Sequence, residues 1–232
     1  MKKVGIIVFA ATLVVGVAVA GLFSFGRVSG RILNISIDRP VTGSGVPASE
    51  ERNVAEFSGI DASGMFHVDI TSGKEQSVRI EADDNILPRI QTEVRGGVLH
   101  LESEGRINMS TPVRVTITMN DLESIDASGA SRISAVNVKN GSLRINSSGA
   151  SKISVAGETT RLTVDVSGAS NVDTAGLQAQ DASVDASGAS RVEVLAVNRL
   201  ESDASGASRV VYSGSPANLI KRSSGASSIT QK

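Results

Sequence analysis

Hydrophobic and polar residues alternate in short runs along most of this chain of 232 residues. In Leu143-Arg144-Ile145 and in Leu162-Thr163-Val164, for example, one polar residue separates two apolar ones. A period of two is typical of half-buried strands, because successive side chains of a strand point to opposite faces. The spacing of three and four that marks an amphipathic helix is not sustained anywhere in 52–232. The pattern therefore predicts an all-β protein built from short strands.

The alternating runs are joined by the motif Ser-Gly-Ala-Ser, which occurs six times at spacings of 18 to 20 residues. Its glycines are Gly129, Gly149, Gly168, Gly188, Gly206 and Gly225. A β-branched residue follows each glycine at a distance of four residues: Ile133, Ile153, Val172, Val192, Val210 and Ile229. The related sequence Asp61-Ala62-Ser63-Gly64 comes 65 residues before Gly129, which we interpret as about three more periods.

A repeat of about 19 residues is too short to close a core of its own, so it must stack on its neighbours. It is also too short for a propeller blade, and the variable spacing breaks the register of hexapeptide helices. We therefore predict a parallel β-helix (a solenoid) in which equivalent residues stack about 4.8 Å apart. Glycine supplies the positive φ of a sharp corner, and the neighbouring serine hydroxyls can hydrogen-bond the backbone there.

The N-terminus has the pattern of an export or membrane segment. Lys2 and Lys3 precede an uncharged run from Val4 to Gly26. Such a run is typical of a signal peptide, with a cleavage site after Ala20, and it is also about long enough to span a bilayer. We therefore predict that residues 1–26 are a signal peptide or an N-terminal membrane anchor.

The remaining chain divides into a linker and one repeat domain. The Pro- and Gly-containing residues 27–51 predict a linker with one short strand at 32–37. Residues 52–232 are predicted to form the β-helix domain, with irregular first coils at 52–122 and regular repeats at 123–232. A separate β-sandwich in the first part is the alternative.

The first part has its own strand and turn signals. Residues 66–70 and 78–81 alternate as strands on both sides of a turn, and so do residues 113–117. Gly96-Gly97 separates two further alternating runs, which predicts a β-hairpin. At the other end of the chain the last repeat is polar and contains Lys221, which suits a terminal capping coil.

Two charged columns flank the repeated motif. Three residues before the glycine stand Asp126, Asn146, Asp165, Asp185, Asp203 and Arg222. Three residues after it stand Arg132, Lys152, Asn171, Arg191, Arg209 and Ser228. Stacked carboxylates repel one another, so we expect the basic column to compensate them in a solvated ion-pair ladder. A calcium ladder is the alternative, although calcium repeats pack more carboxylates into a nine-residue period.

The segments between the repeats resemble the bacterial DUF2807 family, the auto-transporter adhesin "head GIN" domain. The matching residues are Phe57-Ser58-Gly59-Ile60-Asp61-Ala62-Ser63-Gly64, Asp84-Asn85-Ile86-Leu87-Pro88 and Thr92-Glu93-Val94-Arg95-Gly96-Gly97-Val98-Leu99. The resemblance covers about 52–230 and implies an exported right-handed β-helix, similar in shape to pectin lyases, with a role in adhesion and no assigned catalytic residues. This chain carries Ser-Gly-Ala-Ser where other members carry turns of the Gly-Ile-Asn type.

Composition excludes several classes of function. The chain has no Cys, which excludes disulfides, thiolate metal sites and a Cys nucleophile. Aromatic residues make up 3% of the chain, so it lacks a stacking platform for sugars or unpaired bases. The net charge of −1 provides no basic field to hold nucleic acid.

Individual polar residues suggest little chemistry. His67 and His100 are expected as surface or half-buried strand residues and not as metal ligands or bases. We expect Asp83-Asp84-Asn85 to form a turn, with a cation site or a carboxylate pair for glycan cleavage as alternatives. The serines fit no nucleophile elbow, and the glycine-rich turns lack the residues of a phosphate loop. We predict no catalytic residue, no metal site and no cofactor.

The leading hypothesis is an exported, non-catalytic β-helix protein of the bacterial cell envelope that acts as an adhesin or surface-interaction module. Its expected partner is an envelope or extracellular surface component, either glycan or protein, and not nucleic acid. Residues 4–26 would contact the membrane if they are not cleaved. The alternatives are a polysaccharide lyase or hydrolase that uses the groove of the β-helix, and a structural envelope spacer.

Overall fold

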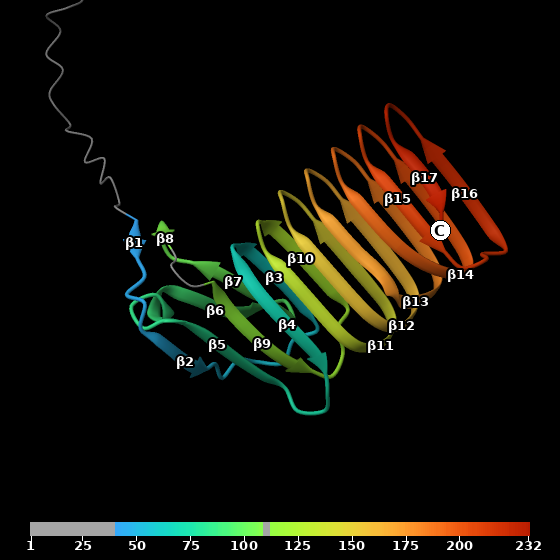
Figure 1. Cartoon of the computed structure of the whole chain (residues 1–232). Helices are drawn as coiled ribbons and strands as arrows, with labels where there is room; N and C mark the ends of the chain where they lie inside the picture. The colour runs from blue at the N-terminus through green and yellow to red at the C-terminus, as the bar shows by residue number, and fades with distance from the viewer. Residues whose placement is uncertain (1–39, 109–111) are drawn as a thin grey trace, which may run out of the picture. The chain divides into compact units, whose positions relative to one another are not determined.

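The computed structural model describes residues 40–108 and 112–232 (Figure 1). The predicted export segment, most of the predicted linker and the strand expected at 32–37 lie outside these residues. In the described part of the chain, no helix is long and apolar enough to cross a membrane.

The described chain is a β-solenoid with about five regular turns. Its strands are β1 Val41–Thr42, β2 Pro47–Glu51, β3 Gly59–Gly64, β4 Phe66–Ser72, β5 Ser77–Asp83, β6 Ile90–Arg95, β7 Val98–Ser103, β8 Ile107–Asn108, β9 Val113–Met119, β10 Ser124–Gly129, β11 Arg132–Ser147, β12 Lys152–Val166, β13 Asn171–Ala186, β14 Arg191–Ala204, β15 Arg209–Ser213, β16 Asn218–Ser223 and β17 Ser228–Gln231. One 3-10 helix, η1, spans Leu87–Arg89. The all-β prediction is confirmed.

Neighbouring coils pair in parallel, with equivalent residues side by side. Ile125 lies beside Ile145, and Ile145 lies beside Val164. The long strands β11 to β14 bend, so that each contributes its first half to one sheet and its second half to another. The Ser-Gly-Ala-Ser corners join these two sheets and form a row of tips along the upper edge of the solenoid in Figure 1.

The core consists of stacked aliphatic columns, as the repeat spacing predicted. One column consists of the residues four positions after each corner glycine, and it is buried from Ile133 to Val210. A second column consists of the residues four positions before each corner glycine, and it is buried from Ile125 to Val184. In the next coil the latter column continues with Ser202, which is also fully buried. Aliphatic side chains fill the interior between the two sheets, which accounts for the scarcity of aromatic residues in this part of the chain.

The corner glycines are required by two features of the corner. Gly168 has a φ of +75°, which is costly for residues with a side chain. A Cβ at this position would also lie 2.5 Å from the carbonyl oxygen of Gly149, the equivalent glycine of the preceding coil. That carbonyl accepts a hydrogen bond of 2.8 Å from the backbone N–H of Ala169. The same contact recurs at each regular corner, so the corners stack directly on one another.

The sequence Asp61-Ala62-Ser63-Gly64 occupies a different place from the one we predicted. It was expected about three periods before Gly129, but β3 pairs directly with β10, and Gly64 lies beside Gly129. The N–H of Ala130 donates a 2.8 Å hydrogen bond to the Gly64 carbonyl. Residues 73–122 are therefore an insertion between two adjacent coils. They fold back so that β7 extends one sheet beyond β3 and β9 extends the other beyond β4.

The insertion also covers the N-terminal end of the solenoid. The predicted hairpin at Gly96-Gly97 is confirmed, because β6 and β7 pair in antiparallel fashion across it. Strand β5 adds antiparallel to β9, and β2 adds antiparallel to β5. Residues 47–51, the last residues of the predicted linker, form a strand whose backbone pairs with the edge of β5.

The C-terminal coil, formed by β16 and β17, closes the other end less completely. All residues of β16 are exposed, including Leu219 at 40%. Lys221 stands in a column that is aliphatic in the first four repeats, and its ammonium group lies 5.5 Å from the centre of the Tyr212 ring. An inward-facing charge on an edge strand opposes further strand addition. This arrangement fits the capping coil that the polar last repeat predicted.

Candidate functional site

A column of carboxylates runs along the outer surface of the sheet that precedes the corners. We use the name acidic column for six residues that lie on six consecutive coils: Asp61, Asp126, Asn146, Asp165, Asp185 and Asp203. These side chains point outward because they alternate with buried residues such as Ile125 and Ala127. Parallel pairing in register places neighbouring members about 4.8 Å apart.

Hydrogen bonds relieve the repulsion within the acidic column at two places, Asp126 and Asp203. Asn146 donates its Nδ2–H to Asp126 Oδ1 at 2.6 Å. Arg222 of the last coil donates to Asp203 Oδ2 at 3.1 Å and to Glu201 at 3.0 Å. Hydrogen bonds from Arg222, and then from Arg199, lower the pKa of Glu201. The column therefore ends at an arginine on the C-terminal side.

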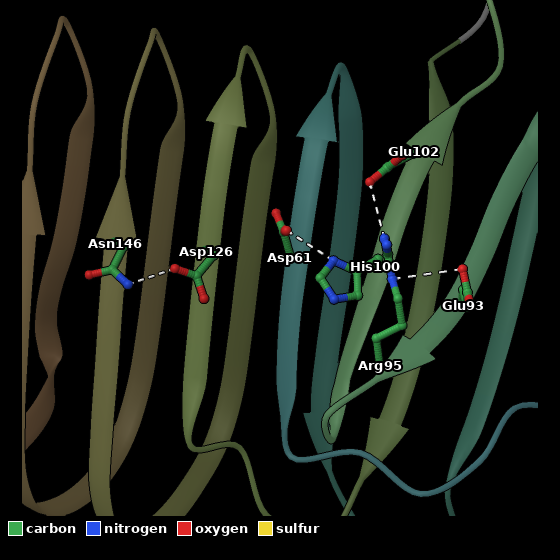
Figure 2. Close-up of polar contacts among 7 residues, drawn as sticks. All are labelled: Asp61, Glu93, Arg95, His100, Glu102, Asp126 and Asn146. Atoms are coloured by element: carbon green, nitrogen blue, oxygen red, sulfur yellow. Dashed lines mark hydrogen bonds and ion pairs between the residues drawn. The ribbon is translucent and has the colours of Figure 1, made fainter.

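On the N-terminal side the acidic column meets His100, and Glu93 of β6 lies beside His100 in turn. Strand β7 pairs with β3 so that His100 lies beside Asp61, and its Nδ1 is 3.0 Å from Asp61 Oδ2 (Figure 2). Arg95, from the same hairpin, lies 3.5 Å from Glu102 and 3.7 Å from Glu93. These Arg95 pairs are largely exposed, so they contribute little to stability.

The members of the acidic column from Asp61 to Asp185 line an open groove of about 590 Å³. The serines that directly precede the corner glycines also line it, among them Ser128, Ser148, Ser167 and Ser187. The lining residues thus come from equivalent positions of successive coils. Such a groove offers hydroxyl groups repeatedly along its length, together with carboxylates that Asn146 interrupts once.

A basic column follows the corners on the neighbouring sheet. We use this name for Arg132, Lys152, Asn171, Arg191 and Arg209, which β-pairing places in one row. His67 and Arg114 extend the row toward the N-terminal end. The members are exposed or half-buried, because they alternate with the buried column of Ile133 and its equivalents.

The expected ion-pair ladder between the two columns is not present in the described chain. The corner carries Asp185 and Arg191 onto different sheets, so residues on its two sides do not meet. Arg191 instead pairs with Glu193 at 2.9 Å on its own strand, and Arg114 pairs with Asp69 at 2.7 Å on the neighbouring strand. Among the described residues, Asp185 and Arg209 form no ion pair.

His67 lies between two arginines in the basic column. Its Nε2 is 3.4 Å from an Arg132 nitrogen, and Arg114 flanks it on the other side. Burial, followed by the charges of Arg132 and Arg114, lowers the pKa of His67, while Asp69 opposes this shift. His67 and His100 are both half-buried residues of strands, as predicted.

The remaining candidates do not assemble a reactive centre in the described chain. Asp83 is the last residue of β5, and Asp84 and Asn85 begin the predicted turn before η1. Their side chains hold the segment before β2, where the Asn85 side-chain N–H donates a 2.9 Å hydrogen bond to the Thr42 carbonyl. Over residues 40–108 and 112–232, no three His, Asp or Glu side chains group as metal ligands. In that part of the chain no serine hydroxyl is hydrogen-bonded to His67 or His100.

A sequence comparison identifies the family of the chain. Residues 56–216 match DUF2807, described as "Putative auto-transporter adhesin, head GIN domain". The chain belongs to this family. Its match covers both the insertion and the regular coils, and it confirms the resemblance carried by residues 57–64 and 84–99. No curated protein matches the chain in sequence.

Solved structures share the fold. A "putative adhesin" from Bacteroides fragilis is 19% identical, with a TM-score of 0.69 over 83% of this chain and all of that one. A "putative lipid binding protein" from Parabacteroides distasonis is 18% identical, with a TM-score of 0.52 over 84% of this chain and all of that one. A "putative adhesin" from Parabacteroides merdae is 16% identical, with a TM-score of 0.51 over 83% of this chain and 98% of that one. At these identities the similarity concerns the fold alone.

The sequence analysis found the members of both columns but missed two features of the site. It did not place Asp61 in the acidic column, because the insertion hides the stacking of Gly64 on Gly129. It also did not predict that His100 extends this column. The shared pattern Ile-Asp-Ala-Ser-Gly at residues 60–64 and 125–129 was the available signal for the first feature.

Proposed function

We propose that this protein is an exported, non-catalytic, adhesin-like module of the bacterial envelope, which binds its partner through the acidic column and the adjoining serines. The observation that carries the proposal is the composition of the groove. Successive coils supply a serine hydroxyl and, except at Asn146, a carboxylate at a spacing of about 4.8 Å. Repeated weak contacts of this kind add up along an extended partner, which suits adhesion.

The same observation disfavours a polysaccharide lyase or hydrolase. An enzyme of that type needs different groups in different roles at one place, such as an acid and a base or nucleophile at a defined separation. The groove instead repeats equivalent groups. The pair of His100 and Asp61 continues the column by one strand and brings no second carboxylate to a defined distance. A structural spacer is the second alternative, and it predicts that the acidic column is dispensable.

We further propose that residues 1–26 export the protein and either hold it in the membrane or are cleaved after Ala20. The lysines and the long apolar run support this proposal. Right-handed winding of the solenoid is likewise proposed from the family. The expected partner carries positively charged groups, because it must match a row of carboxylates.

The binding test uses the full chain on surfaces coated with cell-wall glycan or with extracellular protein. Saturable binding is expected on at least one surface, and the double variant Asp165→Asn, Asp185→Asn should lose most of it. The matched control is Glu158→Gln, Asp181→Asn, which changes the net charge equally at exposed positions outside the groove. Equal binding by both variants would refute a role for the acidic column and favour the spacer.

A further inference from the structure

The basic column contains one section whose positive charges have no acidic partner. Elsewhere in the column Arg191 pairs with Glu193 of its own strand at 2.9 Å. Arg132 and Lys152 lie side by side on β11 and β12, and neither forms an ion pair with any residue of 40–108 or 112–232. Both side chains are exposed. Two neighbouring cations without an acidic partner repel each other and leave most of their N–H donors available to a ligand.

The second row of side chains on this face explains why these two cations are unpaired. It consists of the residues two positions after the basic column on five neighbouring strands: Asp69, Ser134, Ser154, Asp173 and Glu193. They share the outer face with the basic column, because side chains alternate along a strand. The row is acidic on β4, β13 and β14, and it carries serines on β11 and β12. We use the name cationic patch for Arg132 and Lys152 together with the adjoining Ser134 and Ser154.

His67 adjoins the cationic patch beside Arg132. Its Nε2 lies 3.4 Å from an Arg132 nitrogen, so the guanidinium group meets an imidazole ring there and not a carboxylate. Asp69, on the same strand as His67, is engaged by Arg114 at 2.7 Å. Burial, followed by the charges of Arg132 and Arg114, lowers the pKa of His67, while Asp69 opposes this shift. Positive charge around the cationic patch therefore exceeds the negative charge beside it.

The cationic patch has the groups of an anion site. Arginine and lysine donate charge-assisted hydrogen bonds to carboxylate or phosphate oxygens, and serine hydroxyls add further donors. An anion placed between Arg132 and Lys152 would also offset their mutual repulsion. The patch is open to water, so a single contact of this kind is weak. Stable binding therefore needs several contacts along one ligand.

The basic column offers further contacts along the same line. Asn171 and Arg191 follow Lys152 on the next two coils, and Arg209 follows them on the third. Arg209 forms no ion pair among the described residues, and it lies about 14 Å from Lys152 along the row. An elongated ligand that crosses the strands can therefore contact the cationic patch and Arg209 together.

We propose that the cationic patch binds carboxylate groups of a linear acidic polysaccharide, which follows the basic column across successive coils. A sugar ring is about as long as one coil step, so the charges of such a polymer recur at about the spacing of the strands. Binding through charges and hydroxyl groups needs no aromatic stacking platform, and aromatic residues make up only 3% of this chain. The inference goes beyond the proposed function, because it assigns a ligand of opposite charge to a different sheet.

The acidic column confines this ligand to one side of the corners. Carboxylates of the polymer and of the acidic column repel each other, which opposes binding across both sheets. The two sheets that meet at the corners would then hold partners of opposite charge at the same time. Such a module would join a cationic surface component to an acidic polysaccharide.

The first experiment measures binding of the full chain to polygalacturonate by isothermal titration calorimetry. The double variant Arg132→Gln, Lys152→Gln should bind several-fold more weakly. The matched control is Lys139→Gln, Arg161→Gln, which removes the same charge from exposed positions of the same two strands outside the column. Raising the salt from about 0.1 M to about 1 M should weaken binding by the unchanged chain, because the screening length falls from about 10 Å to about 3 Å. Equal losses in the two double variants would overturn the inference, because net charge alone would then control binding.

The second experiment uses the histidines as reporters of where the polymer binds. The chain contains two of them, His67 and His100, so NMR can follow each ring separately. Polygalacturonate should raise the pKa of His67 toward its ordinary value, because bound carboxylates offset the charges of Arg132 and Arg114. The NMR signals of His100, which lies beside Asp61 on the other sheet, should not respond to the polymer. An equal response of both rings, or no response of His67, would contradict the assigned site.

Further comparisons test the identity of the ligand and its separation from the acidic column. Neutral dextran should not bind, and polyphosphate, whose charges are more closely spaced than the coils, should bind more weakly than polygalacturonate. Equally tight binding of polyphosphate would show that charge density controls the contact, and the assignment to a polysaccharide would be wrong. The variant Asp165→Asn, Asp185→Asn should bind polygalacturonate at least as tightly as the unchanged chain. Weaker binding by this variant would place the polymer on the acidic column and overturn the inference.

Discussion

The solenoid closes its coils in two different ways. From Gly129 onward, each corner is followed by the next after 18 to 20 residues. At Gly64 the chain instead leaves the stack, folds residues 73–122 and returns to Gly129 as the adjacent corner. The first corner also differs in detail, since φ of Gly64 is +135° and the buried Phe66 stands where regular corners carry a buried serine. The buried columns therefore continue from coil to coil even where residues 73–122 of the chain intervene between two stacked coils.

The largest expected effect comes from making the first corner like the others. Phe66→Ser should lower the free energy of unfolding by about 4 kcal/mol, because it empties a site that the phenyl ring fills. Phe66→Leu, which keeps most of the volume, should cost about 1.5 kcal/mol. Urea denaturation measures both. A loss below about 1 kcal/mol for Phe66→Ser would show that the two kinds of corner are interchangeable.

A regular corner is tested by Gly168→Ala. The positive φ and the approach to the Gly149 carbonyl should together cost about 3 kcal/mol. The control is Gly141→Ala, where an added Cβ meets nothing within 4 Å, and it should leave stability unchanged or raise it by about 0.5 kcal/mol. Similar unfolding midpoints for the two variants would contradict direct stacking of the corners.

A smaller effect is expected where the regular coils depart from their own pattern. Ser202 continues the aliphatic column of Val184, and its buried hydroxyl has no hydrogen-bond partner. Ser202→Val should raise the free energy of unfolding by about 1 kcal/mol, because it removes an unsatisfied polar group from the core. Ser183→Val, on the exposed side of the neighbouring coil, should change stability by less than about 0.5 kcal/mol. Destabilisation by Ser202→Val would indicate that the hydroxyl has a structural partner.

The smallest effect concerns His67 in the first coil. Its folded pKa lies below the ordinary value of about 6.5. The unfolded chain therefore takes up the proton first as the pH falls, and stability decreases from about pH 6.5 downward. His67→Gln should remove this part of the pH dependence, as measured by thermal unfolding at a series of pH values. His100→Gln is the comparison, and an identical change in both profiles would argue against the effect of Arg132 and Arg114.

The repeats made most of the regular part predictable from sequence. Each corner glycine and each β-branched residue four positions later carries the same local signal, so the buried columns could be read directly. The position of Gly64 could not be predicted from the sequence. Gly64 stacks on Gly129 only because strands on both sides of residues 73–122 pair with each other, and these strands are far apart in sequence. The hairpin at Gly96-Gly97 was readable, whereas its placement beside β3 was not.

The candidate site was predictable in its residues but not in its geometry. Asp185 and Arg191 flank the same glycine, which suggested that they compensate each other. Whether such residues contact each other depends on the angle through which the corner turns the chain. The sequence Ser-Gly-Ala-Ser does not predict that angle. His100 gave no signal, because its neighbour Asp61 lies on another strand of the sheet.

The stacking of each corner on the one before it has a consequence for how this protein can vary. A coil touches only its two neighbours, so the loss or duplication of one repeat leaves every other contact in place. The gene can therefore lengthen or shorten the molecule in units of about 4.8 Å by changing copy number alone. The same event adds or removes one carboxylate-bearing position and one alanine, so reach and binding strength would evolve together.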